Sequence, residues 1–141
     1  MKPPGTINKK GLDELISLIP ELESYQGSFG EHDFRKEGNT LHMGPFNYSP
    51  LLDNIVHSIH EAGLQITFDW PSWQDEAERI CNEPGELEKA DLETIRKLLT
   101  LHLRKERFCE GHLAAVCECG LMLSTLRRLK TLRDEGAIEA V

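Results

Sequence analysis

The chain has 141 residues, of which 39% are hydrophobic and 28% are charged, and its formal net charge at pH 7 is −8. This composition is typical of one folded domain and excludes a largely disordered chain. The acidic balance argues against broad, non-specific binding to nucleic acid, because such binding depends on neutralising phosphates. The sequence has neither a long apolar run nor an apolar leader, so we expect a cytoplasmic protein with no membrane partner.

Positive charge is concentrated in the second half of the chain. Residues 1–90 contain 7 Lys and Arg against 16 Asp and Glu, whereas residues 91–141 contain 9 against 8. Between Arg104 and Arg133 the basic residues outnumber the acidic ones by 7 to 3. This local excess predicts a basic face that binds an anion or an acidic partner on an otherwise acidic protein.

The first third of the chain combines one helical pattern with a glycine-rich stretch. Apolar residues at helical spacing predict an amphipathic helix over residues 11–23, bent or ended near Pro20. The helical spacing is then lost, glycines become frequent, and Thr40-Leu41-His42-Met43 is a strand candidate. A long stretch without structure is unusual in a compact domain, so we expect a small irregular or β-hairpin element near residues 25–48.

The remainder of the chain reads mostly as helix. Ser49-Pro50 is typical of a helix start, and the helix that follows is predicted to end at Gly63. Leu64–Phe68 is a candidate for a short extended segment. Ser72, followed by acidic residues, resembles the start of a third helix that runs to about Cys81. Three more helices are predicted over residues 91–107, 109–119 and 121–133.

These patterns predict a mainly α fold, with five to six helices and the small irregular or β-hairpin element in a single compact domain spanning residues 1–141. We expect the ordered core to cover about residues 11–133. Residues 1–8 and the tail over residues 135–141 are expected to be flexible, because chain ends without apolar anchors commonly fray.

Arginines form a stripe on the predicted helix over residues 91–107. Arg96, Arg104 and Arg107 lie on one face if that helix is continuous. Arginine pairs bidentately with phosphate and carboxylate groups, so the stripe is a candidate anion site. The alternative is a solvated face, or arginines paired internally with Glu106 and Glu110.

The segment Phe68-Asp69-Trp70-Pro71-Ser72-Trp73 contains both tryptophans of the chain. Trp70 and Trp73 are candidates for an aromatic wall that stacks on a planar ligand or anchors a partner. The alternative is that the aromatic residues fix a loop on the core while Asp69 accepts hydrogen bonds from the backbone or from arginine.

Cysteine and histidine are close in sequence near residue 110, at Cys109, His112, Cys117 and Cys119. Zinc sites usually take their ligands from closely spaced Cys pairs on turns, and this spacing runs along a predicted helix instead. In a cytoplasmic protein these cysteines are expected to be thiols. We therefore expect neither a metal site nor a cofactor.

A catalytic alternative rests on Glu110 and His112, which lie near Arg107 and are candidates for an acid–base pair. The chain has no recognisable nucleophile elbow, phosphate-binding loop or metalloprotease motif that would define a reaction.

Several short segments resemble those of a family of small bacterial proteins that share a domain of unknown function. The family has an F-D-W segment, here Phe68-Asp69-Trp70, and an R-x-[DE]-R-F-x-E-G segment, here Arg104–Gly111. Arg128-Leu129 resembles the R-L pair of its closing helix, and Met43–Ser49 resembles its M-P-Y-x-x-Y-S segment with Gly44 as a departure. The resemblance covers roughly residues 21–132 and implies no reaction, cofactor or partner.

The residues and the resemblance together define one candidate site. We expect Arg104 and Arg107 to meet Asp69 or Glu110 across a helix corner and to shape one pocket. The full set of candidate ligand- or partner-binding residues is Asp69, Trp70, Trp73, Arg104, Arg107, Glu110 and His112.

The leading functional prediction is a non-enzymatic interaction or regulatory module that binds an acidic protein partner or a small anionic ligand. The first alternative is a nucleic-acid-binding protein, and the second is a small enzyme that uses the Glu110 and His112 pair. A purely structural subunit is a third. The sequence leaves the oligomeric state open. The nucleic-acid alternative would use Arg96, Arg104, Arg127, Arg128 and Lys130.

Overall fold

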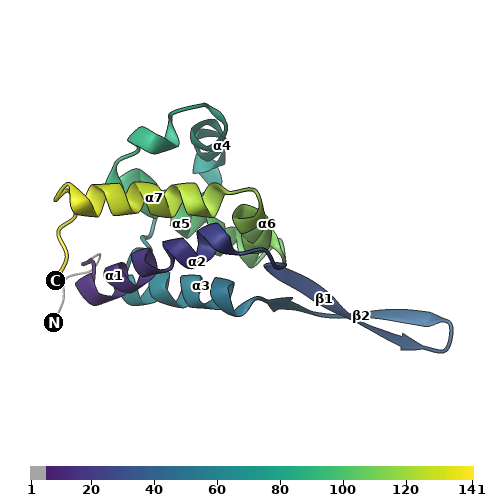
Figure 1. Cartoon of the computed structure of the whole chain (residues 1–141). Coiled ribbons are helices and arrows are strands. Elements are labelled where there is room, and N and C mark those ends of the chain that lie inside the picture. Colours follow the sequence, from purple (N-terminus) through teal and green to yellow (C-terminus); the bar gives the residue numbers. More distant parts are fainter. Residues whose placement is uncertain (1–5) are drawn as a thin grey trace.

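The computed structural model describes residues 6–141, which form a mainly helical domain with one two-stranded antiparallel hairpin (Figure 1). This confirms the predicted fold class. The elements in chain order are α1 (Lys9–Ser17), α2 (Ile19–Ser24), β1 (Gly30–Glu37), β2 (Thr40–Tyr48), α3 (Pro50–Ala62), α4 (Gln74–Asn82), α5 (Leu92–Glu106), α6 (His112–Glu118) and α7 (Leu121–Asp134), with 3-10 turns η1 (Pro71–Trp73) and η2 (Leu87–Lys89).

The helix predicted over residues 11–23 is two helices, α1 and α2, which meet at Leu18. Pro20 lies in the first turn of α2, where its missing N–H costs no hydrogen bond. The predicted bend therefore occurs at the start of a new helix. If α1 and α2 are counted as one bent helix, residues 6–141 contain six α-helices.

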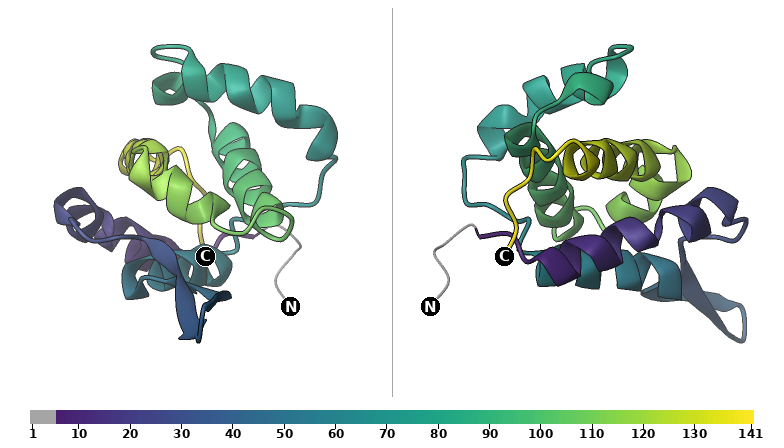
Figure 2. Two further views of the ribbon diagram at one scale, coloured as in Figure 1. Left: turned by 90° about the vertical axis from the view of Figure 1, so that its right-hand side faces the viewer. Right: turned by 60° about the vertical axis from the view of Figure 1, so that its left-hand side comes forward.

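The glycine-rich stretch forms a hairpin, and both of its strands are longer than the predicted strand candidate. The pairing runs from Gly30 opposite Tyr48 to Glu37 opposite Thr40, and a bulge interrupts it near Asp33. The hairpin extends away from the helices as an arm (Figures 1 and 2).

The helices pack around one core. Helix α1 packs on α3, and α7 contacts α1, α2, α5 and α6, so α7 lies at the centre of the bundle (Figure 2). Helix α4 lies at the edge of the bundle (Figure 1). The largest fully buried side chains are Leu12, Leu15, Leu52, Ile55, Ile59, Leu64, Ile95, Leu98, Leu99, Met122, Leu126 and Leu129.

Side-chain caps lie at three helix starts. Asn8 accepts a hydrogen bond from Gly11 N–H, Ser49 from Leu52 N–H, and Asp91 from Thr94 N–H. Each cap satisfies a backbone donor that has no partner within its own helix. The starts of α3 and α5 were predicted from the sequence, whereas the first helix was predicted to start at residue 11 and begins instead at Lys9. The starts concerned are those of α1, α3 and α5.

Two local predictions need correction. Helix α4 begins at Gln74 without a side-chain cap, and the Ser72 hydroxyl instead donates a hydrogen bond to Asp69 at 2.7 Å. The predicted extended segment Leu64–Phe68 forms no strand. Its backbone is held by α5, because Ile66 N–H donates to Thr100 Oγ1 at 3.0 Å.

The C-terminal tail, predicted to be flexible, is hydrogen-bonded to the start of the chain. Ala140 forms a parallel bridge with Ile7, Val141 N–H donates to Ile7 O at 2.9 Å, and Lys9 N–H donates to Val141 O at 3.0 Å. Ile7 is buried beside this bridge, which gives the contact an apolar anchor. Residues 1–5 of the predicted flexible N-terminus lie outside the described residues.

Across residues 6–141, no helix has the length and apolar content needed to cross a lipid bilayer.

Candidate functional site

The corner between α5 and α6 is organised by Glu106, the last residue of α5. Its carboxylate accepts hydrogen bonds from Gly111 N–H at 3.0 Å, from Leu113 N–H at 2.8 Å, and from the Tyr48 hydroxyl. The two backbone donors belong to the start of α6, which has no cap from its own sequence. Glu106 therefore caps the next helix and links it to β2. We call these four residues the corner network.

The base of the arm packs against the same corner. Burial and the hydrogen bond to Glu106 raise the pKa of Tyr48 well above its usual value. The Phe46 ring lies 4.9 Å from the Tyr48 ring and packs close to Gly111. His32 Nδ1 lies 3.5 Å from Glu110 Oε1. The strands of the hairpin are therefore fixed to the bundle at their base.

On the outer side of the corner, two aromatic rings and two arginines form the corner surface, which consists of Trp70, Arg104, Arg107 and Phe108. The rings of Trp70 and Phe108 have centroids 6.0 Å apart and are tilted by 34°. Phe108 is 77% exposed, which is unusual for a large apolar side chain. Arg104 lies one helical turn before Phe108, and Arg107 immediately precedes it.

Arg104 and Arg107 have no ion-pair or hydrogen-bond partner for their side chains within residues 6–141. Other arginines on the surface are paired. Arg79 contacts Glu76, Glu83 and Glu86, Arg127 contacts Glu23, and Arg133 contacts Asp13 and Asp134. Unpaired arginines next to the exposed Phe108 ring leave the corner surface with positive charge available to a ligand.

The predicted arginine stripe is divided along α5. Arg96 donates to Leu64 O at 3.1 Å and to Gly63 O at 3.0 Å, so it holds the connection between α3 and α4. Burial of this guanidinium lowers its pKa. Arg104 is half-buried like Arg96 but has no such carbonyl partner within residues 6–141, and Arg107 at the end of the stripe is exposed.

Asp69 and Trp73 have local structural contacts. Asp69 accepts hydrogen bonds from the Ser72 hydroxyl and from Ser72 N–H, which close the turn before α4. Trp73 packs edge-on against Phe68, and Lys97 Nζ lies 5.7 Å from the Trp73 ring. The expected pairing of Arg104 or Arg107 with Asp69 or Glu110 is not formed, since each carboxylate has a nearer partner.

The expected acid–base pair of Glu110 and His112 is not formed either. His112 Nε2 lies 3.0 Å from His102 Nδ1, while Glu110 faces His32. Burial, then the nearby His112 and Lys105, lower the pKa of His102 to about 4, and burial also lowers the pKa of His112. Both rings are therefore held neutral. His102 Nε2 is buried without a hydrogen-bond partner from the described part of the chain.

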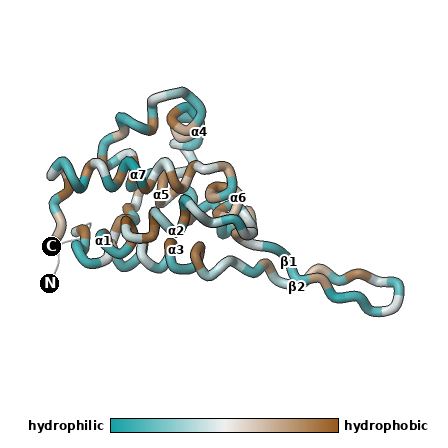
Figure 3. The backbone as a smooth tube through the Cα atoms, in the orientation of Figure 1, coloured by the Kyte–Doolittle hydropathy of each residue, from teal (hydrophilic) through white to brown (hydrophobic). Residues whose placement is uncertain are grey.

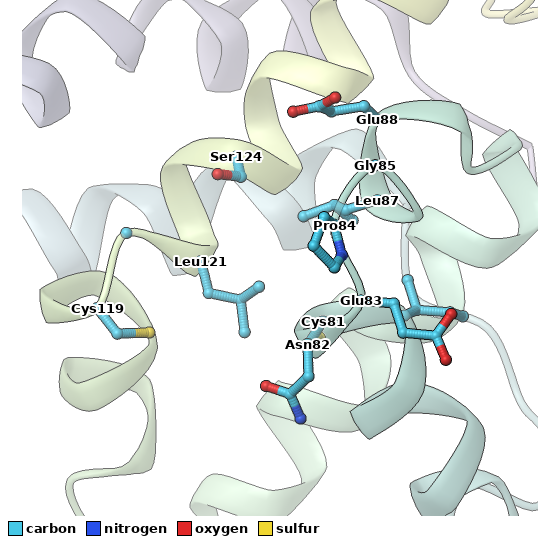
Figure 4. A pocket seen from close by; sticks show the side chains of 12 residues that line it. Cys81, Asn82, Glu83, Pro84, Gly85, Leu87, Glu88, Cys119, Leu121 and Ser124 are labelled. Carbon is cyan, nitrogen blue, oxygen red and sulfur yellow. The ribbon is translucent and has the colours of Figure 1, made fainter.

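Two hollows lie between α4 and the rest of the bundle. A cavity of about 190 Å³ is lined by both histidines together with Glu78, Cys81 and Lys105. A more open hollow of about 410 Å³ lies between η2 and the start of α7, with Cys81 and Cys119 on opposite sides (Figure 4). The first is smaller than most ligand pockets, which usually exceed about 300 Å³. Neither includes a residue of the corner surface.

The four cysteines are free thiols in different surroundings, with Cys117 buried and Cys109 and Cys119 exposed. Within residues 6–141, no three His, Cys, Asp or Glu side chains are arranged to hold a metal ion. Cys117 is buried, and that burial raises its pKa to about 12, so its thiol remains protonated at neutral pH.

Sequence analysis missed Tyr48, Glu106 and His102 as residues of the corner. Glu106 lies inside the R-x-[DE]-R-F-x-E-G segment, so the resemblance contained a signal for it. Tyr48 lies 58 residues away in sequence, and His102 differs from its buried leucine neighbours only by being polar. No local sequence pattern predicts the contact of Tyr48 with Glu106 or the contact of His102 with His112.

The profile of a family described as "Family of unknown function (DUF6508)" matches residues 7–135, so the chain belongs to this family. The match includes the residues on which the family resemblance was based. Neither the curated proteins nor the solved structures include a match to the chain.

Proposed function

We propose that this protein is an interaction module that binds an acidic segment of a protein partner at the corner surface. One observation carries the proposal: the exposed Phe108 ring, which contacts the half-buried Trp70, lies next in sequence to Arg104 and Arg107, and neither arginine has a carboxylate partner within residues 6–141 of this acidic chain.

The chemistry of the surface matches an acidic peptide that also carries an apolar side chain. Arginine guanidinium groups bind carboxylates through two parallel hydrogen bonds. Large aromatic side chains are common anchors at interfaces, because burying them removes apolar area from water with little loss of conformational freedom. Phe108 and Trp70 offer that area, while Arg104 and Arg107 offer the charge.

The residues of the nucleic-acid alternative are mostly engaged elsewhere. Arg96 and Arg128 donate to backbone carbonyls, Arg127 contacts Glu23, and Lys130 contacts Asp134. Only Arg104 remains without a partner in the described chain. A phosphate backbone needs several free cations along its length, so this arrangement favours a short acidic segment over nucleic acid.

The test is binding of a fluorescein-labelled peptide that carries glutamates around one tryptophan, followed by fluorescence anisotropy at low salt. We expect the double change of Arg104 and Arg107 to Ala, and separately Phe108→Ala, each to weaken binding by about tenfold or more. Lys10→Glu is the matched control, because Lys10 is exposed and distant from the corner surface.

Competition separates the possible ligands. Full displacement of the peptide by citrate or phosphate at low concentration would identify a small anionic ligand instead of a peptide. Tighter binding of single-stranded DNA than of the peptide would favour the nucleic-acid alternative. Unchanged peptide binding in both corner-surface variants would rule out the proposal.

A further inference from the structure

The outer arm, which we define as residues 33–44 of the hairpin, exposes a row of apolar side chains. Phe34 is 61% exposed, and Leu41 and Met43 are each 64% exposed. Phe34 is directly opposite Met43 in the register, and Leu41 is opposite Lys36, so these residues share one face of the ribbon. The hydropathy view shows these hydrophobic segments on the extended arm (Figure 3).

This part of the ribbon has no support from the bundle. The base of the hairpin packs on α5 and α6, but the outer arm projects beyond them (Figures 1 and 2). An isolated two-stranded ribbon is only marginally stable in water, and it usually needs a third strand or a packing surface. Together with the exposed apolar row, this indicates that another chain covers the outer arm.

The two edges of the ribbon differ in their ability to pair. The edge of β2 is interrupted at the bulge, where Gly44 and Pro45 lie opposite the single residue Asp33. Proline has no N–H, and bulges disrupt pairing, so this edge is protected against another strand. The edge of β1 contains no proline and is exposed over most of its length. An added strand therefore pairs with β1.

Charges at the centre of β1 complement those of a second copy of β1. If two such strands pair antiparallel with Phe34 opposite Phe34, then Asp33 of each copy lies opposite Arg35 of the other, directly beside the two-fold axis. Farther from the axis, Glu31 lies opposite Glu37, and these like charges are exposed at the ends of the pairing and weaken it less than the central pairs stabilise it. Within residues 6–141 of one chain, the ion pair of Arg35 is with the exposed Glu37, at 3.5 Å, and such exposed pairs contribute little. Phe34 and Met43 of both copies then form one continuous apolar row across the four strands.

The overall distribution of charge is compatible with this arrangement. Residues 30–48 contain two basic and three acidic residues, so the hairpin carries one net negative charge and the remainder of the chain carries seven. Contact through projecting arms brings the nearly neutral parts together and keeps the acidic bundles apart, which limits the repulsion between them.

We propose that this protein forms a homodimer in which β1 pairs antiparallel with β1 of a second copy, with Phe34 at the two-fold axis. The dimer is a symmetric, self-complementary contact that closes on itself and produces a four-stranded sheet. This inference is independent of the proposed peptide site, since the corner surface lies at the opposite end of the hairpin.

The test is size-exclusion chromatography with light scattering on the full chain, over about a hundredfold range of protein concentration. We expect a dimer for the wild type. Arg35→Glu places like charges opposite Asp33 of the other copy, and it is expected to weaken the dimer by at least about tenfold. The double change Asp33→Arg with Arg35→Glu restores opposite charges and is expected to recover dimerisation.

Two further variants make the result specific. Phe34→Ser is expected to weaken the dimer as strongly as Arg35→Glu, because it removes the central apolar contact. Lys10→Glu is the matched control for charge, since it changes the net charge by the same amount on the distant helix α1 and should leave the dimer unchanged. Far-UV circular dichroism confirms that each variant retains its helices.

Any of three results would overturn the proposal. The first is a monomeric wild type at the highest concentration, which would leave the outer arm to a different partner. The second is a dimer that Phe34→Ser and Arg35→Glu leave unchanged, because its interface would then lie elsewhere. The third is failure of the double charge exchange to restore the dimer, which would exclude this strand register.

Discussion

The two ends of the hairpin show how the same secondary structure can be rigidly fixed or almost unsupported. At the base, Tyr48 donates to Glu106, and Glu106 also holds the first backbone donors of α6. In the outer arm, Phe34 and Met43 are mostly exposed, and the arm projects away from the helices (Figure 1). Hydrogen bonds within the ribbon are formed at both ends, so the difference lies in tertiary contacts. Stability in this protein should therefore depend strongly on the corner and weakly on the outer arm.

The largest loss of folding stability is expected from Glu106→Ala. This change leaves Gly111 N–H, Leu113 N–H and the Tyr48 hydroxyl without their acceptor, and losing partners of partly buried donors is costly. We expect the free energy of unfolding to fall by about 3 kcal/mol. Glu110→Ala is the control, because Glu110 is exposed and its contact with His32 should contribute less than about 0.5 kcal/mol. Urea denaturation measures both, and equal losses would contradict the assigned role of Glu106.

The second prediction concerns acid, through the buried His102. Its pKa of about 4 lies below the value of 6.5 for an unfolded chain, so below pH 6.5 the unfolded state binds more protons than the folded state. The contribution of His102 to stability is thus complete above pH 6.5 and decreases as the pH falls toward 4. We expect a loss on the order of 2–3 kcal/mol over this interval.

The check is urea denaturation of the wild type and of His102→Gln at several pH values. The variant should show a flatter dependence of stability on pH, whatever its stability at pH 7. His57→Gln provides the control, because His57 is exposed on α3. Parallel curves for the wild type and His102→Gln would show that His102 is not held neutral.

The third prediction compares two glycines with positive φ. Gly111, at φ 90°, lies in the corner, and an added Cβ there would come within 3.3 Å of the Phe46 ring. We expect Gly111→Ala to destabilise the fold by about 1–3 kcal/mol, through backbone strain and crowding. Gly38, at φ 59°, lies at the hairpin tip with open space around it.

Gly38→Ala should disturb only the tip, with less than about 0.5 kcal/mol lost from global unfolding, because the outer arm opens locally. Thermal denaturation compares the two variants, and amide hydrogen exchange locates the disturbance. If Gly38→Ala lowered the free energy of global unfolding more than Gly111→Ala, the conclusion that the corner matters more for stability than the tip would be wrong.

The smallest effect is expected from Tyr48→Phe, which removes one hydroxyl from the corner network and should cost about 1 kcal/mol near neutral pH. The pH dependence gives a second readout. An unfolded tyrosine loses its proton near pH 10.0, whereas the raised pKa of Tyr48 keeps the folded state protonated. Above pH 10 the unfolded state binds fewer protons, so wild-type stability decreases as the pH rises. Tyr48→Phe should decrease less steeply in this range.

Much of the fold was predictable because its signals are local. The start of α3 at Ser49-Pro50, its end before Gly63, and the cap of α5 by Asp91 all depend on residues within one helical turn. The hairpin was predicted in outline, because glycines and a strand candidate replace the helical spacing. Its length was not predicted, since the exposed strands lack the alternation of buried and exposed residues that marks a strand in a core.

The candidate site was predicted less well, because sequence spacing cannot show which partner a charge finds. Arg96 and Arg104 occupy equivalent positions on one stripe, yet Arg96 binds the carbonyls of Gly63 and Leu64 while the Arg104 side chain has no partner within residues 6–141. Asp69, predicted as a partner for arginine, is closer to its neighbour Ser72. The pairing of charges depends on which segments are folded over which turn of α5.

The sequence by itself determined the family, the mainly helical architecture, the helix boundaries set by local caps, and the local excess of positive charge between Arg104 and Arg133. Only the tertiary structure decided that Glu106 caps a helix and anchors the hairpin, that His102 and His112 form a buried pair, and that the outer arm is left without cover. The physical reason is that helix propensity and capping act over one turn of chain. Hydrogen-bond partners and burial depend instead on contacts between residues as distant as Tyr48 and Glu106.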